Sequence, residues 1–148
     1  ERPLTKLLEL GLVPVLYGDA VLDSETGFSI LSGDQLVSSL AIRLDAGRII
    51  LGVDVDGLYT ADPKTDSSAR LIQHIPLGEL RKLQHRIEKP KVTDVTGGML
   101  GKVLELMPAI ERGVSALVLN AGKPGNVYKA LKGEGVVGTM IEGSETIA

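Results

Sequence analysis

Cysteine and tryptophan are both absent from this chain of 148 residues. The lack of cysteine excludes a disulfide framework, a thiolate zinc site and a thiol nucleophile. Histidine occurs only twice, which is too little to build a metal or catalytic site by itself. Aromatic residues amount to 3%, too few for the stacking surface on which single-stranded nucleic acid is bound. Any base that this protein binds would therefore meet mainly aliphatic walls.

The sequence also lacks a long apolar run, a signal peptide and an excess of positive charge. No apolar stretch approaches the length that a bilayer-spanning helix needs, so we expect a cytoplasmic protein without a membrane partner. The net charge of −3 provides no electrostatic footprint for nucleic acid. Apolar residues make up 43% and charged residues 24%, a balance that excludes disorder and predicts one compact domain.

Short apolar runs alternate with segments of helical periodicity along the chain. Expected strands cover 12–17, 48–53, 69–75, 115–120 and 136–141, and an expected hairpin covers 20–31 with its turn at 24–27. Expected helices cover 5–10, 34–44, 98–112 and 127–131, with a brief one opened by Pro76. Glycine and aspartate follow several of the strands. This order predicts an α/β fold with a mainly parallel open sheet, whose ligand lies outside the carboxyl ends of the strands.

A glycine pair, Gly97 and Gly98, opens the expected helix of residues 98–112. Lys102 lies in the second turn of that helix. The first N–H groups of a helix have no partner within the helix and lie at the positive end of its dipole, so they attract an anion. This arrangement suits a phosphate. The alternative is a glycine cap with Lys102 in solvent, and the glycine spacing is too short for a Walker loop.

Two carboxylates, Asp54 and Asp56, follow the apolar strand 48–53. They could bind magnesium, hydrogen-bond a ribose or an adenine amine, or cap the loop through Asx turns. Gly57 permits a close approach of the backbone, and Tyr59 can cover a base, which favours a nucleotide. Lys64 is either a phosphate contact or a solvent-exposed side chain.

The segment Ser32-Gly33-Asp34 lies where the hairpin turns into a helix. One interpretation is ordinary N-capping by Ser32 or Asp34, worth about 1 kcal/mol. In the functional interpretation, the Gly33 amide contacts a substrate phosphate and Asp34 orients a catalytic lysine. An acidic group beside a transferred phosphate needs a neighbouring cation, and Lys102 is the candidate in this chain.

These segments together resemble the amino acid kinase superfamily and, more narrowly, the archaeal-type isopentenyl phosphate kinases. The similarity covers nearly the whole chain, in the family's order, through the segments 13–23, 28–36, 54–64, 94–102 and 138–141. The Tyr-Gly-Asp hairpin followed by Ser-Gly-Asp-Gln-Leu is the more discriminating part. The Asp-Gly-Leu-Tyr-Thr-Ala-Asp-Pro segment looks equally like uridylate, glutamate and acetylglutamate kinases.

The resemblance implies a three-layer αβα sandwich that binds ATP and Mg²⁺ and forms a homodimer. It implies transfer of the γ-phosphate to isopentenyl phosphate, which yields isopentenyl diphosphate for isoprenoid synthesis. Carried over by position, Gly33 corresponds to a substrate-phosphate contact and Asp34 to the acidic organiser. The loop from Asp54 to Tyr59 corresponds to the nucleoside contacts, and Gly98 and Lys102 to contacts with the ATP phosphates.

The front of the chain departs from the family pattern. Family members carry an N-terminal Lys-Leu-Gly-Gly-Ser phosphate loop and a histidine for the substrate phosphate, and neither is present in this sequence. We therefore expect residues 1–148 to be a single nucleotide-binding lobe from a longer chain, poorly active alone. The alternatives are a family phosphotransferase with another acceptor (uridylate, acetylglutamate, glutamate or fosfomycin kinase-like) and a noncatalytic nucleotide-binding module.

Overall fold

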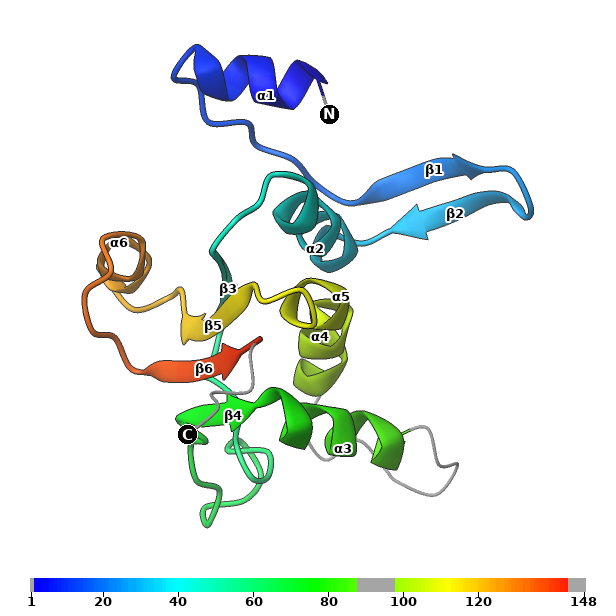
Figure 1. Ribbon diagram of the computed structural model, residues 1–148. Coiled ribbons are helices and arrows are strands. Elements are labelled where there is room, and N and C mark those ends of the chain that lie inside the picture. Colours follow the sequence, from blue (N-terminus) through cyan, green and yellow to red (C-terminus); the bar gives the residue numbers. More distant parts are fainter. Residues whose placement is uncertain (1, 88–97, 144–148) are drawn as a thin grey trace.

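A four-stranded sheet forms the centre of the computed structural model, which describes residues 2–87 and 98–143 (Figure 1). Its strands, in spatial order, are β3 (Arg48–Val53), β5 (Ser115–Asn120), β6 (Gly138–Glu142) and β4 (His74–Pro76). The pairs β3–β5 and β4–β6 are parallel, whereas β5 and β6 are antiparallel. The sheet is therefore mixed, and β3 and β5 end at the same edge.

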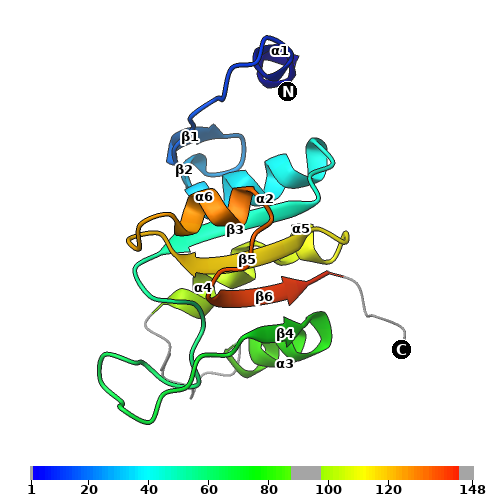
Figure 2. The same ribbon diagram turned by 90° about the vertical axis from the view of Figure 1, so that its left-hand side faces the viewer.

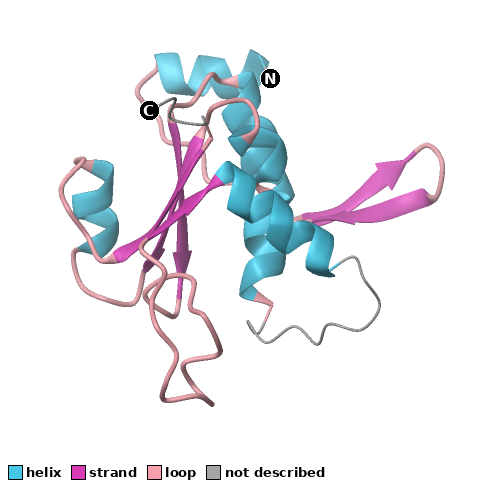
Figure 3. Cartoon of the chain, turned by 60° about the horizontal axis from the view of Figure 1, so that its bottom comes forward, coloured by secondary structure: helices cyan, strands magenta, loops and turns pink. Residues whose placement is uncertain are grey.

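Helices cover both faces of this sheet (Figures 2 and 3). One face carries α6 (Asn126–Leu131), which packs on β3 and β5. The other face carries α2 (Gly33–Arg43), α4 (Met99–Glu105) and α5 (Met107–Ile110), and α3 (Leu77–Ile87) follows β4 directly. The predicted three-layer αβα architecture is confirmed. No helix in the described ranges is both long and apolar enough to cross a membrane.

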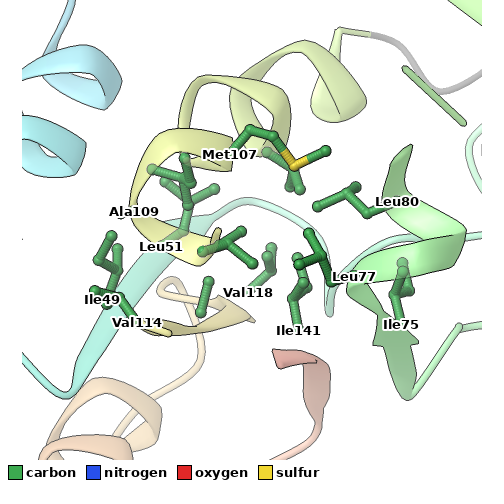
Figure 4. Close-up of a cluster of buried hydrophobic side chains, with 14 of the residues drawn as sticks. Ile49, Leu51, Ile75, Leu77, Leu80, Met107, Ala109, Val114, Val118 and Ile141 are labelled. Atoms are coloured by element: carbon green, nitrogen blue, oxygen red, sulfur yellow. The ribbon is translucent and has the colours of Figure 1, made fainter. Parts of the chain in front are cut away.

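The core lies between the sheet and the layer of α3, α4 and α5 (Figure 4). Ile49 and Leu51 point into it from β3, two residues apart, as the alternation of side chains along a strand requires. Leu117, Val118 and the residues on either side of them in β5 are all buried, because this central strand is covered on both faces. The continuous apolar run in the sequence therefore reflects the position of the strand in the sheet.

The segment predicted as a buried strand at 12–17 is not one. It has no strand partner among the described residues, and the side chains of Val13 and Val15 are 85% and 89% exposed. An apolar run predicts burial only where a neighbouring strand is within reach. The segment connects α1 (Arg2–Glu9) to a separate antiparallel hairpin, β1 (Asp19–Asp23) and β2 (Gly27–Leu31). The predicted hairpin is confirmed, but its turn covers residues 24–26 and not 24–27, because Gly27 pairs with Asp23 as the first residue of β2.

Two other expected elements are shorter than predicted. The helix expected over 98–112 is divided at Leu106 into α4 and α5, and Pro108 lies in the first turn of α5, where its missing N–H costs no hydrogen bond. The strand expected over 69–75 contributes only β4 to the sheet, while Leu71 forms an isolated antiparallel bridge with Tyr59. That bridge belongs to the loop that follows β3.

Candidate active site

A cleft lies at the carboxyl end of β3, as the fold class predicts for a ligand site. Most of its wall comes from the loop after β3, and one wall residue comes from the start of α4. Its lining residues are Asp54, Val55, Gly57, Leu58, Tyr59, Ala61, Asp62, Pro63, Lys64 and Met99. The two segments that the sequence analysis singled out separately, the aspartate loop and the start of the glycine-preceded helix, thus border one cleft.

Asp54 and Lys64 form an ion pair on the wall of this cleft. Lys64 Nζ lies 2.8 Å from Asp54 Oδ2, and both side chains are largely exposed. The hydrogen bond from Lys64, followed by its charge, lowers the pKa of Asp54 below its usual 3.8, and the same contact raises the pKa of Lys64 above its usual 10.5. Both groups are therefore charged throughout the neutral range.

This pair predicts a titration that can be measured directly. Because the pKa of Asp54 is lower in the folded chain than in the unfolded one, the pair stabilises the fold above the unfolded value of 3.8, and this stabilisation is lost as the pH falls through the lower folded value. A carboxyl ¹³C NMR titration should give a midpoint for Asp54 below 3.8. Lys64→Met should raise that midpoint. Lys132→Met, which removes a lysine at the end of α6, should leave it unchanged. Equal midpoints in all three proteins would disprove the contact in solution.

Asp56 is paired with the loop that follows β5. Its Oδ1 lies 2.6 Å from Lys123 Nζ, and its side chain is only 24% exposed. Within the described part of the chain it is not among the lining residues, although the sequence analysis predicted a cofactor contact. In this structure Asp56 joins the loop after β3 to the loop after β5, and a direct contact with a ligand stays a prediction.

Lys123 and Asn120 are the site-region residues that sequence reasoning missed. Asn120 ends β5; its Nδ2 donates to the Asp54 carbonyl at 3.3 Å, and its Oδ1 accepts from the Gly122 N–H at 2.9 Å. Asn126 Nδ2 donates in turn to the Asn120 carbonyl at 3.1 Å. One feature of the sequence could have indicated these residues. The strand 115–120 is followed by a polar loop, and the loops after the parallel neighbours β3 and β5 lie at the same edge of the sheet.

Asp34 and Lys102 form a third ion pair in this region. Lys102 Nζ lies 2.8 Å from Asp34 Oδ2, and the Asp34 side chain is 19% exposed. Lys102 follows Met99 by three residues, so the two are neighbours on one face of α4. This places the pair beside the cleft that Met99 lines. The contact expected between these residues is present, and their catalytic roles stay predictions.

The local structure around Asp34 follows from its sequence. Ser32 caps α2 by accepting from the Gln35 N–H at 3.0 Å, and the Gln35 side chain accepts from the Ser32 N–H at 3.2 Å, which completes a capping box. Gly33 is exposed in the first turn, with open space where a side chain would be. Gly98 precedes α4 in the left-handed region at φ 81°, a conformation that favours glycine. Gly97 lies outside the described residues.

Comparison with known proteins agrees with this geometry. The sequence pattern of the amino acid kinase family matches residues 1–120. The chain belongs to this family. An amino acid kinase-family fold accounts for the open αβα layers and for the cleft at the carboxyl end of β3.

Three relatives illustrate the likeness. Isopentenyl phosphate kinase of Methanothermobacter thermautotrophicus is 50% identical over 139 residues, which are 92% of this chain and 51% of that protein. Uridylate kinase of Thermofilum pendens is 37% identical, over 93% of this chain and 53% of that protein. A crystal structure of isopentenyl phosphate kinase superposes with a TM-score of 0.75 at 42% identity, over 94% of this chain and 49% of its own. This family member thus spans about half the length of the relatives it matches.

Carboxylates near the cleft are not arranged as a protein-held metal centre. Among the described residues, no three or more histidine and carboxylate side chains gather closely enough to hold a metal ion. Asp54 and Asp56 are each paired with a different lysine.

Proposed function

We propose that this chain is the nucleotide-binding portion of an isopentenyl phosphate kinase, and that the complete enzyme transfers the γ-phosphate of ATP to isopentenyl phosphate. The observation that carries the proposal is that Asp54 and Met99 border the same cleft, and that the Lys102–Asp34 pair lies beside it. The higher identity to the isopentenyl phosphate kinase than to the uridylate kinase, 50% against 37%, supports this acceptor.

The cleft has the chemistry that ATP requires. Leu58, Tyr59 and Met99 supply apolar and aromatic wall for the base, and the Asp54 carboxylate can accept hydrogen bonds from ribose hydroxyls. Lys64 lies opposite Asp54 and can turn toward a phosphate. Lys64 and Lys102 are the two cations in and beside the cleft that the phosphates of a nucleoside triphosphate could contact, and each is held by an aspartate.

Phosphoryl transfer needs charge neutralisation and positioning rather than a covalent intermediate on the protein. In the proposed reaction an oxygen of isopentenyl phosphate forms a bond to the γ-phosphorus while the bond from that phosphorus to the β–γ bridging oxygen breaks, releasing ADP. Lys102 offsets charge on the transferred group, Asp34 holds the Lys102 ammonium in place, and the Gly33 amide contacts the acceptor phosphate.

Several finer features belong to the same proposal. Bound Mg²⁺ would neutralise part of the phosphate charge, and the enzyme would act as a cytoplasmic homodimer on a small molecule, without nucleic acid. The second half of the phosphate-binding site would come from a portion of the enzyme outside residues 1–148. The isolated 148 residues are then expected to bind ATP weakly and to turn over little.

The test uses the complete natural protein that contains this chain. Its intact mass should exceed 15.6 kDa, the mass of residues 1–148. With radiolabelled ATP, isopentenyl phosphate should be phosphorylated about 100-fold more efficiently than UMP, glutamate, acetylglutamate or fosfomycin, because a site built for one acceptor leaves polar groups unpaired with another. A preference for any other acceptor, or full activity of the 148-residue chain alone, would overturn the proposal.

A noncatalytic nucleotide-binding module is the second candidate, favoured by the half-length match to the relatives. The Asp34→Asn variant separates the two. A kinase should lose turnover, because the Lys102 ammonium loses its charged partner. A noncatalytic module should bind ATP as before and give no product with any acceptor.

A further inference from the structure

Thr139 is the second residue of β6, is not among the lining residues of the cleft, and is fully buried. Its hydroxyl makes two hydrogen bonds that cross from the sheet to the cleft wall. Oγ1 accepts from the Leu58 N–H at 2.8 Å and donates to the Ile72 carbonyl at 2.6 Å. One side chain of the central sheet thus holds two backbone segments that are distant in the sequence.

One of those two segments forms part of the wall of the cleft, and the other is hydrogen-bonded to it. The Leu58 carbonyl accepts from the Ile72 N–H at 2.8 Å, and the neighbouring residues Tyr59 and Leu71 form an antiparallel bridge. Leu58 and Tyr59 line the cleft, whereas Ile72 is not among the lining residues. A shift of this short ladder relative to β6 would therefore move the aromatic and aliphatic wall of the cleft.

Gly57 makes the close contact with Thr139 possible. A Cβ at this position would collide with Thr139 Oγ1 and would lie 2.9 Å from the Thr139 nitrogen. Gly57 also has a φ of 156°, which residues with a side chain rarely adopt. The loop after β3 can thus lie directly against β6, which Figure 2 shows between β5 and β4.

We propose that Thr139 is a positioning residue of the nucleotide cleft: its buried hydroxyl sets the position of Leu58 and Tyr59 relative to the sheet. The part of the proposal that concerns ATP rests on the proposed function. Thr139 touches no ligand itself and acts through the Leu58 backbone. Its two hydrogen bonds matter because a buried N–H or carbonyl without a partner is costly, so the loop is held at one distance from β6.

The test compares Thr139→Val, which keeps the shape and removes the hydroxyl, with Thr139→Ser, which keeps the hydroxyl. Ser38→Ala is the matched control, because it also deletes a buried hydroxyl, one that makes no hydrogen bond among the described residues and lies on α2 away from the wall. ATP affinity is measured by titration calorimetry, and amide hydrogen exchange is followed at Leu58.

Thr139→Val should weaken ATP binding about 10-fold and accelerate exchange of the Leu58 amide by a similar factor. Thr139→Ser should stay close to the wild type in both measurements, and Ser38→Ala should leave both unchanged. Unchanged Leu58 exchange in Thr139→Val, or faster exchange with unchanged ATP affinity, would overturn the proposal.

Two further outcomes are also decisive. In the wild type, the Leu58 amide should exchange far more slowly than the Lys64 amide, because the hydrogen-bond acceptor of the Lys64 amide is the exposed Asp62 side chain. This comparison can be made even if Thr139→Val fails to fold. Fast hydrogen exchange of the Leu58 amide would contradict its hydrogen bond to the Thr139 hydroxyl. If the wild type binds no ATP, the proposed function fails, and Leu58 exchange alone decides whether Thr139 holds the loop.

Discussion

Lys102→Met is expected to weaken ATP binding about 10- to 100-fold, the effect of losing one charge-assisted contact to a phosphate. Lys102 is suited to this role because it lies one helical turn from Met99 on the cleft side of α4, and its ammonium is held 2.8 Å from Asp34. The variant keeps the length and apolar stem of the side chain, so the packing of α4 should change little. Titration calorimetry with Mg²⁺ and ATP measures the loss.

The control for this prediction is Lys129→Met. Lys129 is exposed on α6, on the opposite face of the sheet from α4, so the variant removes the same charge at a distance from the cleft (Figure 3). Its ATP affinity should equal that of the wild type. Similar losses in both variants would mean that overall charge, and not a contact from Lys102, attracts the nucleotide.

Ile110→Ala is expected to lower the free energy of unfolding by about 2–5 kcal/mol, the usual effect of truncating a fully buried aliphatic side chain. Ile110 is the last residue of α5, has no exposed surface and belongs to the core cluster beneath the sheet. Other members of the same core cluster, Val118 and Ile141 among them, come from different elements (Figure 4), so the cavity cannot be closed by moving one element. Urea denaturation followed by circular dichroism measures the change.

Leu131→Ala is the comparison for Ile110→Ala. Leu131 is 71% exposed on α6, so the same kind of truncation should change the free energy of unfolding by less than about 0.5 kcal/mol. Equal effects would indicate that Leu131 is covered in solution. A loss below about 1 kcal/mol at Ile110 would contradict the packing of α5 against the sheet.

Local signals in the sequence predicted the elements that carry the site. The strands 48–53 and 115–120 were predicted with the bounds that the structure has, because each is a mainly apolar run with a polar residue, Asp54 or Asn120, at its carboxyl end. The start of α2 was predicted at residue 34, with Ser32 or Asp34 as the cap; the helix begins at Gly33, and Ser32 is the cap, through a capping box of residues three apart. The pair of Asp34 and Lys102 was predicted as well, because an acidic group beside a transferred phosphate needs a neighbouring cation.

Contacts between distant segments could not be predicted in the same way. The partner of Asp56 is Lys123, which lies in the loop after another strand, and nothing in the local sequence of either loop names the other. The hydroxyl of Thr139 reaches Leu58 across 81 positions of the chain. The apolar segment 12–17 is the opposite case, since it has strand-like composition without a strand beside it in the described residues.

The amino-acid sequence by itself determined the identity of the elements and the chemistry at their ends, because periodicity, capping and turn residues act over a few positions. The tertiary structure decided the strand order β3-β5-β6-β4, the reversed direction of β6, and the convergence of Asp54 and Met99 on one cleft. These features depend on which strands pair and on which faces the helices bury. Such choices are made by the packing of the whole core, and no short segment contains them.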